Sequence, residues 1–273
     1  MKRYDDYLIV TDLDGTLYKN QYDIPKINID AVDKFVSLGG KFAVATGRGI
    51  EATRFITEAI NIPNPIIVNN GHAIYDFNNE KIVYNVYLPD RIKEFVKDIH
   101  NKYSSVGIEV YSDRKIFVVS DNNVVKEHLD YEKVDREYIS FDEAVKMNWS
   151  KLLMAEEKEI LEEIIEYSNG LLNEKYVDDG FKTIRTNRRF LEGVCRNIDK
   201  GTGVMELSKA LGLSGEHIYT IGNYYNDIEL VECAYGAWVK NTPDELLPLA
   251  KYITDKTCED GAFAEFVEHV MSL

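Results

Sequence analysis

Short apolar runs alternate with amphipathic segments near both ends of this chain of 273 residues. In the N-terminal part the pattern predicts strands over 7–10, 42–45 and 66–68, separated by helices over 29–38 and 49–60. The first helix buries Val32, Phe35 and Val36 on one face and stops at Gly39-Gly40. This β-α-β-α-β order predicts a parallel sheet with right-handed crossovers.

The same alternation returns near the C-terminus. It predicts strands over 218–221 and 237–239 and helices over 204–211, 227–233, 246–250 and 262–270. A doubly wound parallel sheet binds its ligands at the carboxyl ends of the strands. We therefore expect the chemistry of this protein where these predicted strands end.

The middle of the chain has a different pattern. Strand-like runs over 82–88, 108–111, 116–119, 152–154 and 183–185 are mixed with helices such as 156–167, whose glutamates are expected on a solvated face. This pattern predicts an α+β domain over 84–189, inserted into an α/β domain formed by 1–83 and 190–273. The predicted fold class is α/β, a doubly wound parallel sheet with an inserted α+β domain.

Charge and composition restrict the possible functions. The chain has 47 acidic residues against 32 Lys and Arg, a net charge of −15, which argues against nonspecific nucleic-acid binding. Small anionic substrates remain compatible, because a few local cations outweigh a distant field. The three cysteines have no metal-ligand or redox spacing, and no signal-peptide or membrane-spanning segment is visible. We expect a soluble cytoplasmic protein without a membrane or nucleic-acid partner; the sequence predicts no oligomeric state.

The most specific feature is the motif Asp12-Leu13-Asp14-Gly15-Thr16 after the first predicted strand. One carboxylate can attack phosphorus to form an aspartyl-phosphate, and a second can protonate the leaving oxygen and then activate water. Because two carboxylates repel a phosphate, this chemistry requires a cation, and Mg²⁺ suits oxygen ligands. For this motif taken alone, an ordinary Asp-Gly turn is the alternative.

At these residues the chain resembles the haloacid dehalogenase superfamily, whose hallmark is Asp-x-Asp-Gly-Thr after the first strand. The length and place of the predicted insert resemble the type-two cap of the Cof-type sugar-phosphate phosphatases. Asn69-Asn70-Gly71-His72-Ala73 is similar to a segment of that subgroup. His72 there either contacts substrate or is a hydrogen-bonded structural histidine. The resemblance implies a Rossmann-like core and a cap that closes over the site, excludes water and selects the leaving group.

Two further motifs follow in the order that the resemblance requires. Thr46-Gly47-Arg48 comes after the second predicted strand, where a hydroxyl and main-chain N–H groups can hold phosphoryl oxygens. Lys200 precedes the helix over 204–211, where the positive end of the helix dipole disfavours a lysine unless its ammonium meets an anion. The resemblance implies that this lysine pairs with the nucleophile and the phosphoryl group. Asp199 or Thr202 beside it can instead serve as helix caps.

The fourth motif departs from the family pattern. The usual Gly-Asp-x-x-Asn-Asp is replaced by Gly222-Asn223-Tyr224-Tyr225-Asn226-Asp227, so an amide stands where the family has a Mg²⁺-binding aspartate. Three consequences are open: a higher Mg²⁺ requirement, compensation by Asp227, or loss of activity. We expect retained activity, because the acidic pair of the first motif, Thr46 and Lys200 are all present.

The resemblance assigns each motif a role in a Mg²⁺-dependent phosphatase. Asp12 is the nucleophile and Asp14 the general acid and base, with Thr46 and Lys200 also catalytic. The phosphoryl group is held by Leu13, Thr46, Gly47, Arg48, Lys200 and Asn226. The metal lies among Asp12, Asp14 and Asn223, with Asp227 close. The expected substrate is a small phosphate monoester, probably meaning a sugar phosphate in the terms of the resemblance; arginines 114, 185 and 188 are candidate cap cations.

Two other functions fit the same residues. A phosphomutase or phosphotransferase would return the phosphoryl group to a sugar, using the same site. A phospho-ligand binding protein, weakened in catalysis by Asn223, would bind without releasing phosphate.

Overall fold

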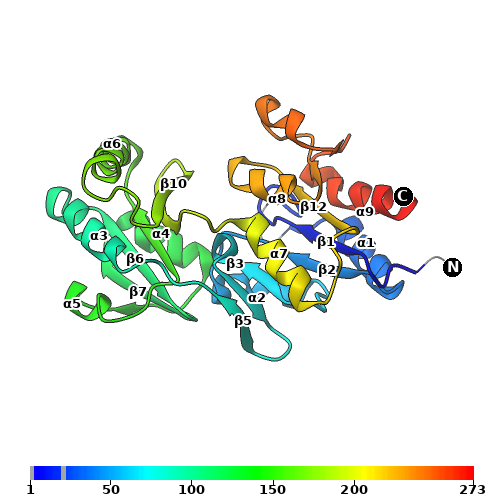
Figure 1. The fold of residues 1–273 in the computed structure, drawn as a ribbon, viewed down its shortest axis with the longest axis horizontal. Coiled ribbons are helices and arrows are strands. Elements are labelled where there is room, and N and C mark those ends of the chain that lie inside the picture. The colour runs from blue at the N-terminus through cyan, green and yellow to red at the C-terminus, as the bar shows by residue number, and fades with distance from the viewer. Residues whose placement is uncertain (1–2, 20–22) are drawn as a thin grey trace. The chain divides into compact units, whose positions relative to one another are not determined.

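The structure is a computed structural model that describes residues 3–19 and 23–273. Residues 1–2 and 20–22 of the predicted domain 1–83, and with them the first residues of the N-terminal segment, lie outside the described part. The chain forms two compact units, one of residues 1–48, 53–85 and 198–273, the other of 49–52 and 86–197. Figure 1 labels their elements.

The first unit is built on a parallel sheet. Its strands are β1 (Leu8–Thr11), β2 (Lys41–Val44), β12 (Ile218–Gly222), β13 (Tyr235–Trp238) and β14 (Tyr252–Ile253). They are ordered β14-β13-β12-β1-β2, and every pairing between neighbours is parallel. The predicted parallel α/β core is confirmed, and β12 lies beside β1 although some 200 residues separate them in sequence.

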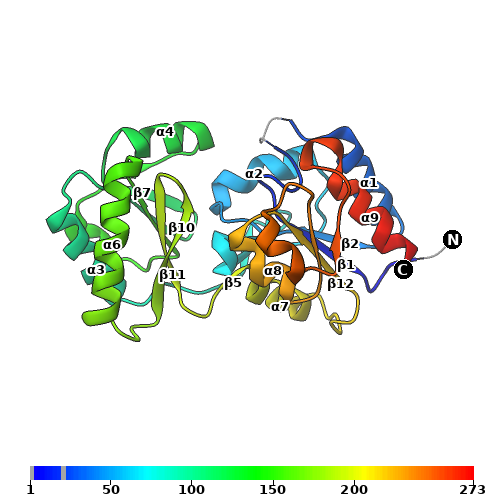
Figure 2. The same cartoon turned by 90° about the horizontal axis from the view of Figure 1, so that it is seen from above.

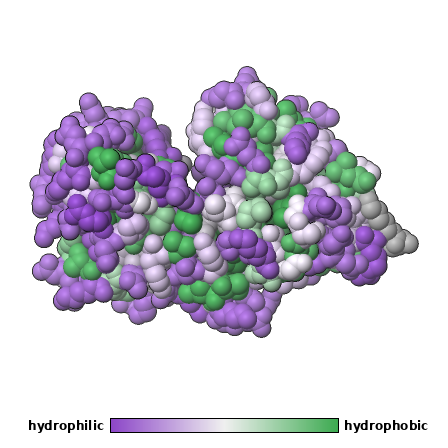
Figure 3. Space-filling view, in the orientation of Figure 1, coloured by the Kyte–Doolittle hydropathy of each residue, from purple (hydrophilic) through white to green (hydrophobic). Residues whose placement is uncertain are grey.

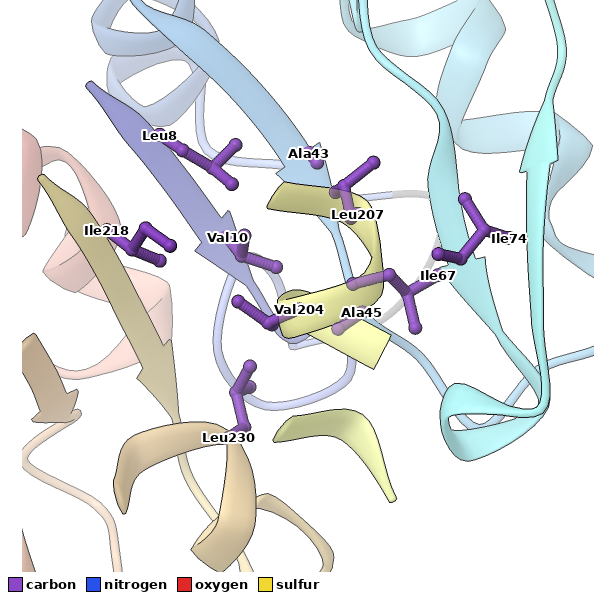
Figure 4. Packing of buried hydrophobic residues seen from close by; sticks show 10 residues of the cluster. All are labelled: Leu8, Val10, Ala43, Ala45, Ile67, Ile74, Val204, Leu207, Ile218 and Leu230. Atoms are coloured by element: carbon purple, nitrogen blue, oxygen red, sulfur yellow. The ribbon is translucent and has the colours of Figure 1, made fainter. Parts of the chain in front are cut away.

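The helices of this unit are α1 (Lys26–Ser37), α2 (Ile50–Ala59), α7 (Lys200–Ala210), α8 (Ile228–Glu232) and α9 (Ala262–Ser272). Val204 and Leu207 of α7 pack on Leu8 and Val10 of β1, in a cluster that Figure 4 shows from close by. In both ribbon views α1 and α9 lie side by side (Figure 2). Phe263 of α9 packs against Phe42 of β2, with ring centroids 5.5 Å apart.

An antiparallel sheet continues from the parallel one. It comprises β3 (Ile66–Val68), β4 (Ala73–Asp76) and β5 (Lys81–Asn85). An isolated parallel bridge between Ala45 and Ile67 joins β3 to the end of β2. Short 3₁₀ segments lie at Asn69–Gly71, Tyr225–Asp227, Asp244–Leu249 and Cys258–Asp260.

The predicted helix over 246–250 is wrong in type. This segment is the 3₁₀ helix η3 (Asp244–Leu249), with Pro248 inside it. Proline lacks the N–H that an α-helix needs, which accounts for the short form.

The second unit, residues 86–197, has an antiparallel-rich sheet with helices. Its sheet order is β10-β11-β9-β6-β7-β8. The strands are β6 (Gly107–Ser112), β7 (Lys115–Ser120), β8 (Glu137–Tyr138), β9 (Lys151–Ala155), β10 (Phe181–Asn187) and β11 (Phe190–Cys195); the helices are α3 (Arg91–Lys102), α4 (Asn123–Glu132), α5 (Phe141–Ala144) and α6 (Lys158–Glu174). The α+β character predicted for the middle of the chain is confirmed.

Helix α6 corrects the prediction over 156–167. It begins two residues later and runs on to Glu174. Leu161 and Ile164 are buried as predicted, whereas Glu156 lies before the helix and is 6 % exposed, not on a solvated face. None of the helices in the described ranges is long and apolar enough to cross a membrane.

Candidate active site

The sheet order brings the predicted motifs to one edge. Strands β12, β1 and β2 are neighbours and parallel, so the loops that follow them emerge at the same end. The first motif follows β1, the second follows β2 and the fourth follows β12. Such an edge is where parallel sheets bind ligands.

Lys200 joins the first and fourth motifs. Its Nζ donates to Asp12 Oδ1 and to Asp227 Oδ1, each at 2.6 Å. Asp12 is 5 % exposed, Lys200 1 % and Asp227 0 %, so three charges share a nearly dry space. A buried lysine with two carboxylates meets the condition that made a lysine at this helix start sensible.

The charges in this group shift one another's pKa. Burial, reinforced by the charge of Asp227, raises the pKa of Asp12 to about 7, against the lowering effect of Lys200. Burial lowers the pKa of Lys200, but the two carboxylates outweigh it and raise the pKa above its usual value. The lysine is therefore charged, and the site carries more negative charge than its own cations balance.

Lys200 is held in place by the start of its helix. Asp199 is the N-cap of α7 and accepts from the N–H of Thr202 at 2.7 Å, while the Thr202 hydroxyl accepts from the N–H of Asp199 at 2.9 Å. This capping box confirms the alternative that assigned these two residues to the helix end. It fixes the main chain from which Lys200 reaches the site.

Asp227 also organises its own loop. Its Oδ2 accepts the N–H groups of Asn223 and Tyr224 at 3.0 and 3.1 Å. Both carboxylate oxygens thus have protein partners, one cationic and two main-chain. This use of Asp227 depends on the folded loop and was missed by the sequence analysis.

Asp14 is paired with Arg48 of the second motif. Arg48 Nε donates to Asp14 Oδ2 and Nη2 donates to Oδ1, both at 2.9 Å, which is a bidentate pair. The Arg48 side chain is 9 % exposed and that of Asp14 47 %. The arginine lies over Phe55 of α2, with Cζ 5.5 Å from the ring centroid.

Gly15 brings the first motif against the fourth. Its φ of +87° suits glycine, and a Cβ there would overlap Nδ2 of Asn223. Asn223 Oδ1 accepts from the Thr16 hydroxyl at 3.1 Å. The residue that departs from the family pattern therefore lies directly against the Asp-x-Asp loop.

Several predicted phosphate-binding groups keep donors that the protein does not use. Within the described residues, the N–H of Leu13 and the side-chain amide of Asn226 have no hydrogen-bond partner. The hydroxyl oxygen of Thr46, 1 % exposed, accepts from the N–H of Arg48 at 3.1 Å, so its own proton stays available. Gly47 lies so close to Asn70 that a Cβ would press on its amide.

The loop after β3 supports the second motif, a role that the sequence analysis missed. The N–H of Asn69 donates to the carbonyl of Arg48 at 2.9 Å, and that of Asn70 to Thr46 at 3.0 Å. Both asparagines are buried with φ near +50°, a conformation that asparagine tolerates. His72, 1 % exposed, bonds through Nδ1 to the carbonyl of Asn69, which supports the structural alternative for this histidine.

The donor set of the site fits Mg²⁺ by its chemistry. Asp12 Oδ2, the carbonyl of Asp14 and Asn223 Oδ1 are hard oxygens. Over residues 3–19 and 23–273, no three His, Cys, Asp or Glu side chains are grouped as a metal centre, so a metal here depends on amide and main-chain oxygens. The excess negative charge around Asp12 favours a cation at this place.

The candidate cap cations are used elsewhere in the second unit. Arg185 forms an ion pair with Glu162 at 2.8 Å, and Arg114 with Glu51 at 2.7 Å. Arg188 is exposed. The three cysteines are free thiols.

A parallel α/β core, an inserted α+β unit and an Asp-x-Asp loop facing a buried lysine define a phosphoryl-transfer class of hydrolases. The model of the haloacid dehalogenase-like hydrolase family matches residues 9–266. The chain therefore belongs to the haloacid dehalogenase-like hydrolases, and the predicted resemblance is confirmed.

Relatives and solved structures agree with this assignment. The 5-amino-6-(5-phospho-D-ribitylamino)uracil phosphatase of Bacillus subtilis is 23 % identical over 97 % of this chain and 96 % of its own. A haloacid dehalogenase-like hydrolase from Bacteroides thetaiotaomicron has the same fold, with a TM-score of 0.85 and 22 % identity over 98 % of this chain and all of its own. A subclass IIB sugar phosphatase matches with a TM-score of 0.81 and 20 % identity over 98 % and 100 %. The predicted enzyme class, a phosphatase of this superfamily, is supported.

Proposed function

We propose that this protein is a Mg²⁺-dependent phosphatase that hydrolyses small phosphate monoesters, of the sugar-phosphate kind, through an aspartyl-phosphate on Asp12. The observation that carries the proposal is the buried contact of Lys200 with Asp12. It places a permanent cation beside a carboxylate at the end of β1, where a dianionic phosphoryl group can be neutralised.

Asp12 is the nucleophile in this proposal. Lys200 holds its Oδ1, whereas Oδ2 has no hydrogen-bond partner among the residues described. One oxygen is therefore oriented and the other is left to attack phosphorus in line with the leaving oxygen. The bond from Asp12 to phosphorus forms as the ester bond breaks, and water later hydrolyses the acyl phosphate.

Asp14 serves the leaving group and then the water. It gives a proton to the leaving oxygen in the first step and takes one from the attacking water in the second. The unused donors of Leu13, Thr46 and Asn226, with Gly47, Arg48 and Lys200, bind the phosphoryl oxygens. A bound Mg²⁺, held by Asp12, the Asp14 carbonyl and Asn223, would supply charge neutralisation of the phosphoryl group.

Asp227 compensates for Asn223 through charge in this proposal. Its two oxygens are already engaged by Lys200 and by two main-chain N–H groups, so its contribution is electrostatic and structural. The substrate class follows the named activities of the similar proteins, a ribityl phosphate derivative in one and sugar phosphates in another. We assign selection of the leaving group to the inserted domain, 84–189.

The nucleophile is tested by Asp12→Asn. Phosphate release should become undetectable, because the amide cannot form a stable phosphoryl ester, while the circular dichroism spectrum stays that of the native protein. Asp30→Asn, an exposed change on α1, is the matched control and should retain full turnover. Undiminished hydrolysis by Asp12→Asn contradicts the assignment.

The substrate class is tested by measuring phosphate release from sugar phosphates, nucleotides and cofactor phosphates with Mg²⁺ present. The proposal expects release, fastest among sugar phosphates. Isomerised sugar phosphate without free phosphate identifies a phosphomutase. Tight binding without release, even in excess Mg²⁺, identifies a binding protein.

A further inference from the structure

The pair of Asp14 and Arg48 occupies both partners with each other. Two N–H groups of one guanidinium donate to both oxygens of one carboxylate, at 2.9 Å each. Such a planar fork fits a carboxylate and a phosphoryl group equally well. Asp14 and a bound phosphoryl group therefore compete for the same face of Arg48.

The surroundings hold the arginine more firmly than the carboxylate. The main chain of Arg48 is fixed on both sides, its N–H bonded to Thr46 Oγ1 and its carbonyl accepting from Asn69. Its guanidinium lies over the ring of Phe55, which makes an edge contact with the buried Tyr18, centroids 5.9 Å apart. The Asp14 side chain is half exposed, so it is the partner that can move.

We infer that Arg48 is a positioning residue that holds Asp14 in the substrate-free enzyme and exchanges it for the phosphoryl group when substrate binds. The inference rests on the proposed function and adds a link between two of its steps. Binding of the anion releases the acid that the leaving oxygen needs, so proton transfer is coupled to occupancy of the site. Coupling of this kind is reciprocal: removing Asp14 strengthens the hold of Arg48 on an anion.

A second arginine of the same helix region provides a matched control. Arg54 lies in α2, bonds to Glu80 Oε1 at 3.0 Å, and has Cζ 5.4 Å from the ring of Phe77. It thus combines a carboxylate and an aromatic ring as Arg48 does, but no predicted site residue takes part. Arg54→Met and Glu80→Gln should leave anion affinity and turnover unchanged.

The test is a double-mutant cycle on the affinity for inorganic phosphate, measured by calorimetry at a fixed Mg²⁺ concentration. Asp14→Asn should tighten phosphate binding about tenfold in the native background, and much less in the Arg48→Met background. Equal tightening in both backgrounds means simple repulsion between Asp14 and the anion, and overturns the inference. No tightening in the native background overturns it as well.

Leaving-group dependence gives an independent reading. An alkyl phosphate needs a proton on its leaving oxygen, whereas p-nitrophenyl phosphate leaves as a stable anion. Arg48→Met should lower kcat for the alkyl ester about tenfold more than for the aryl ester, because Asp14 is no longer positioned. Arg48→Lys should restore the KM in part but not this ratio, because an ammonium lacks the fork.

Failure of the two proposals can be told apart. Equal losses of kcat for both esters, with turnover by the native protein intact, overturn only the role of Arg48, which then merely binds phosphate. A native protein that neither binds phosphate nor hydrolyses either ester overturns the proposed function and this inference together.

Discussion

At the scale of residues, the site depends on which charges face one another in the folded chain. The four motifs and their order are visible in the sequence, including the departure at Asn223. The partners of Asp227 could not be predicted, because they follow from a loop that bends its own N–H groups onto a carboxylate. The same holds for the Asp14–Arg48 pair, which joins residues 34 positions apart.

Asn223 sets the first residue-scale prediction. Asn223→Asp should lower the Mg²⁺ midpoint for activity about tenfold, because it adds a formal charge where only an amide oxygen faces the Thr16 hydroxyl. The measurement is a Mg²⁺ titration of phosphate release for both proteins.

Asn241→Asp is the control for this change. Asn241 Nδ2 donates to the carbonyl of Gly15 at 3.4 Å, so the same charge is added near the same loop without a ligand position. Equal midpoints for the native protein and Asn223→Asp count against Asn223 as a metal ligand.

At the scale of elements, periodicity predicts those parts of the fold that bury one continuous face. Strands β1, β2, β3 and β12 and helices α1, α2, α7 and α9 lie within a few residues of their predicted ranges. Helix α3 went unpredicted, although Ile92, Phe95, Val96 and Ile99 have helical spacing and are buried. Strands β8 and β14 have two residues each, too few for a period to show.

Helix α4 carries a buried histidine against the sheet of the second unit. His128 Nδ1 lies 2.9 Å from Glu109 Oε1, and Nε2 lies 3.5 Å from Glu132 Oε1. Tyr111 also faces this group, donating from its hydroxyl to Glu109 at 2.9 Å. Burial lowers the pKa of His128, but the two carboxylates outweigh it and raise the pKa to about 10.

This histidine makes stability depend on pH. Its pKa is raised from an unfolded value near 6.5, so its contribution is complete below about pH 6.5 and is lost as pH rises toward 10. Between about pH 6 and about pH 9 the native protein should lose up to about 3 kcal/mol more than His128→Gln. Urea unfolding at both pH values measures the difference.

His217→Gln controls for a histidine outside this cluster. His217 is a partly exposed partner of Asp6 in the first unit. Its variant should follow the pH dependence of the native protein. Parallel curves for the native protein and His128→Gln would show that the buried pair does not govern this range.

At the scale of the whole molecule, the chain combines a strongly acidic surface with one small cationic site. Hydrophilic residues cover most of the face in Figure 3, in keeping with the net charge of −15. The cations of the site, Lys200 and Arg48, are buried beneath that surface. Composition alone therefore describes the exterior and says nothing of the anion-binding interior.

The domain boundaries at 83/84 and 189/190 stay a prediction. Strand β11 (Phe190–Cys195) pairs with both β9 and β10, so its hydrogen bonds favour a boundary after Asn197. Periodicity could not show this, because the partners of a strand are set by tertiary pairing.

A fragment comparison tests this boundary. The fragment 86–197 should unfold cooperatively on its own, whereas 84–189 should not, because it lacks a strand from the interior of its sheet. Circular dichroism during thermal unfolding measures both. Cooperative unfolding of 84–189 would instead support the predicted limits.

The central claim is that Asp12 becomes bonded to phosphorus during turnover. Acid quenching of a single turnover, followed by mass mapping of the peptides, tests it most directly. The expected result is one phosphoryl group on Asp12, absent from Asp12→Asn and formed no more slowly than phosphate is released. A phosphoryl group on another residue, or rapid phosphate release with no labelled Asp12 at any time, would contradict the claim.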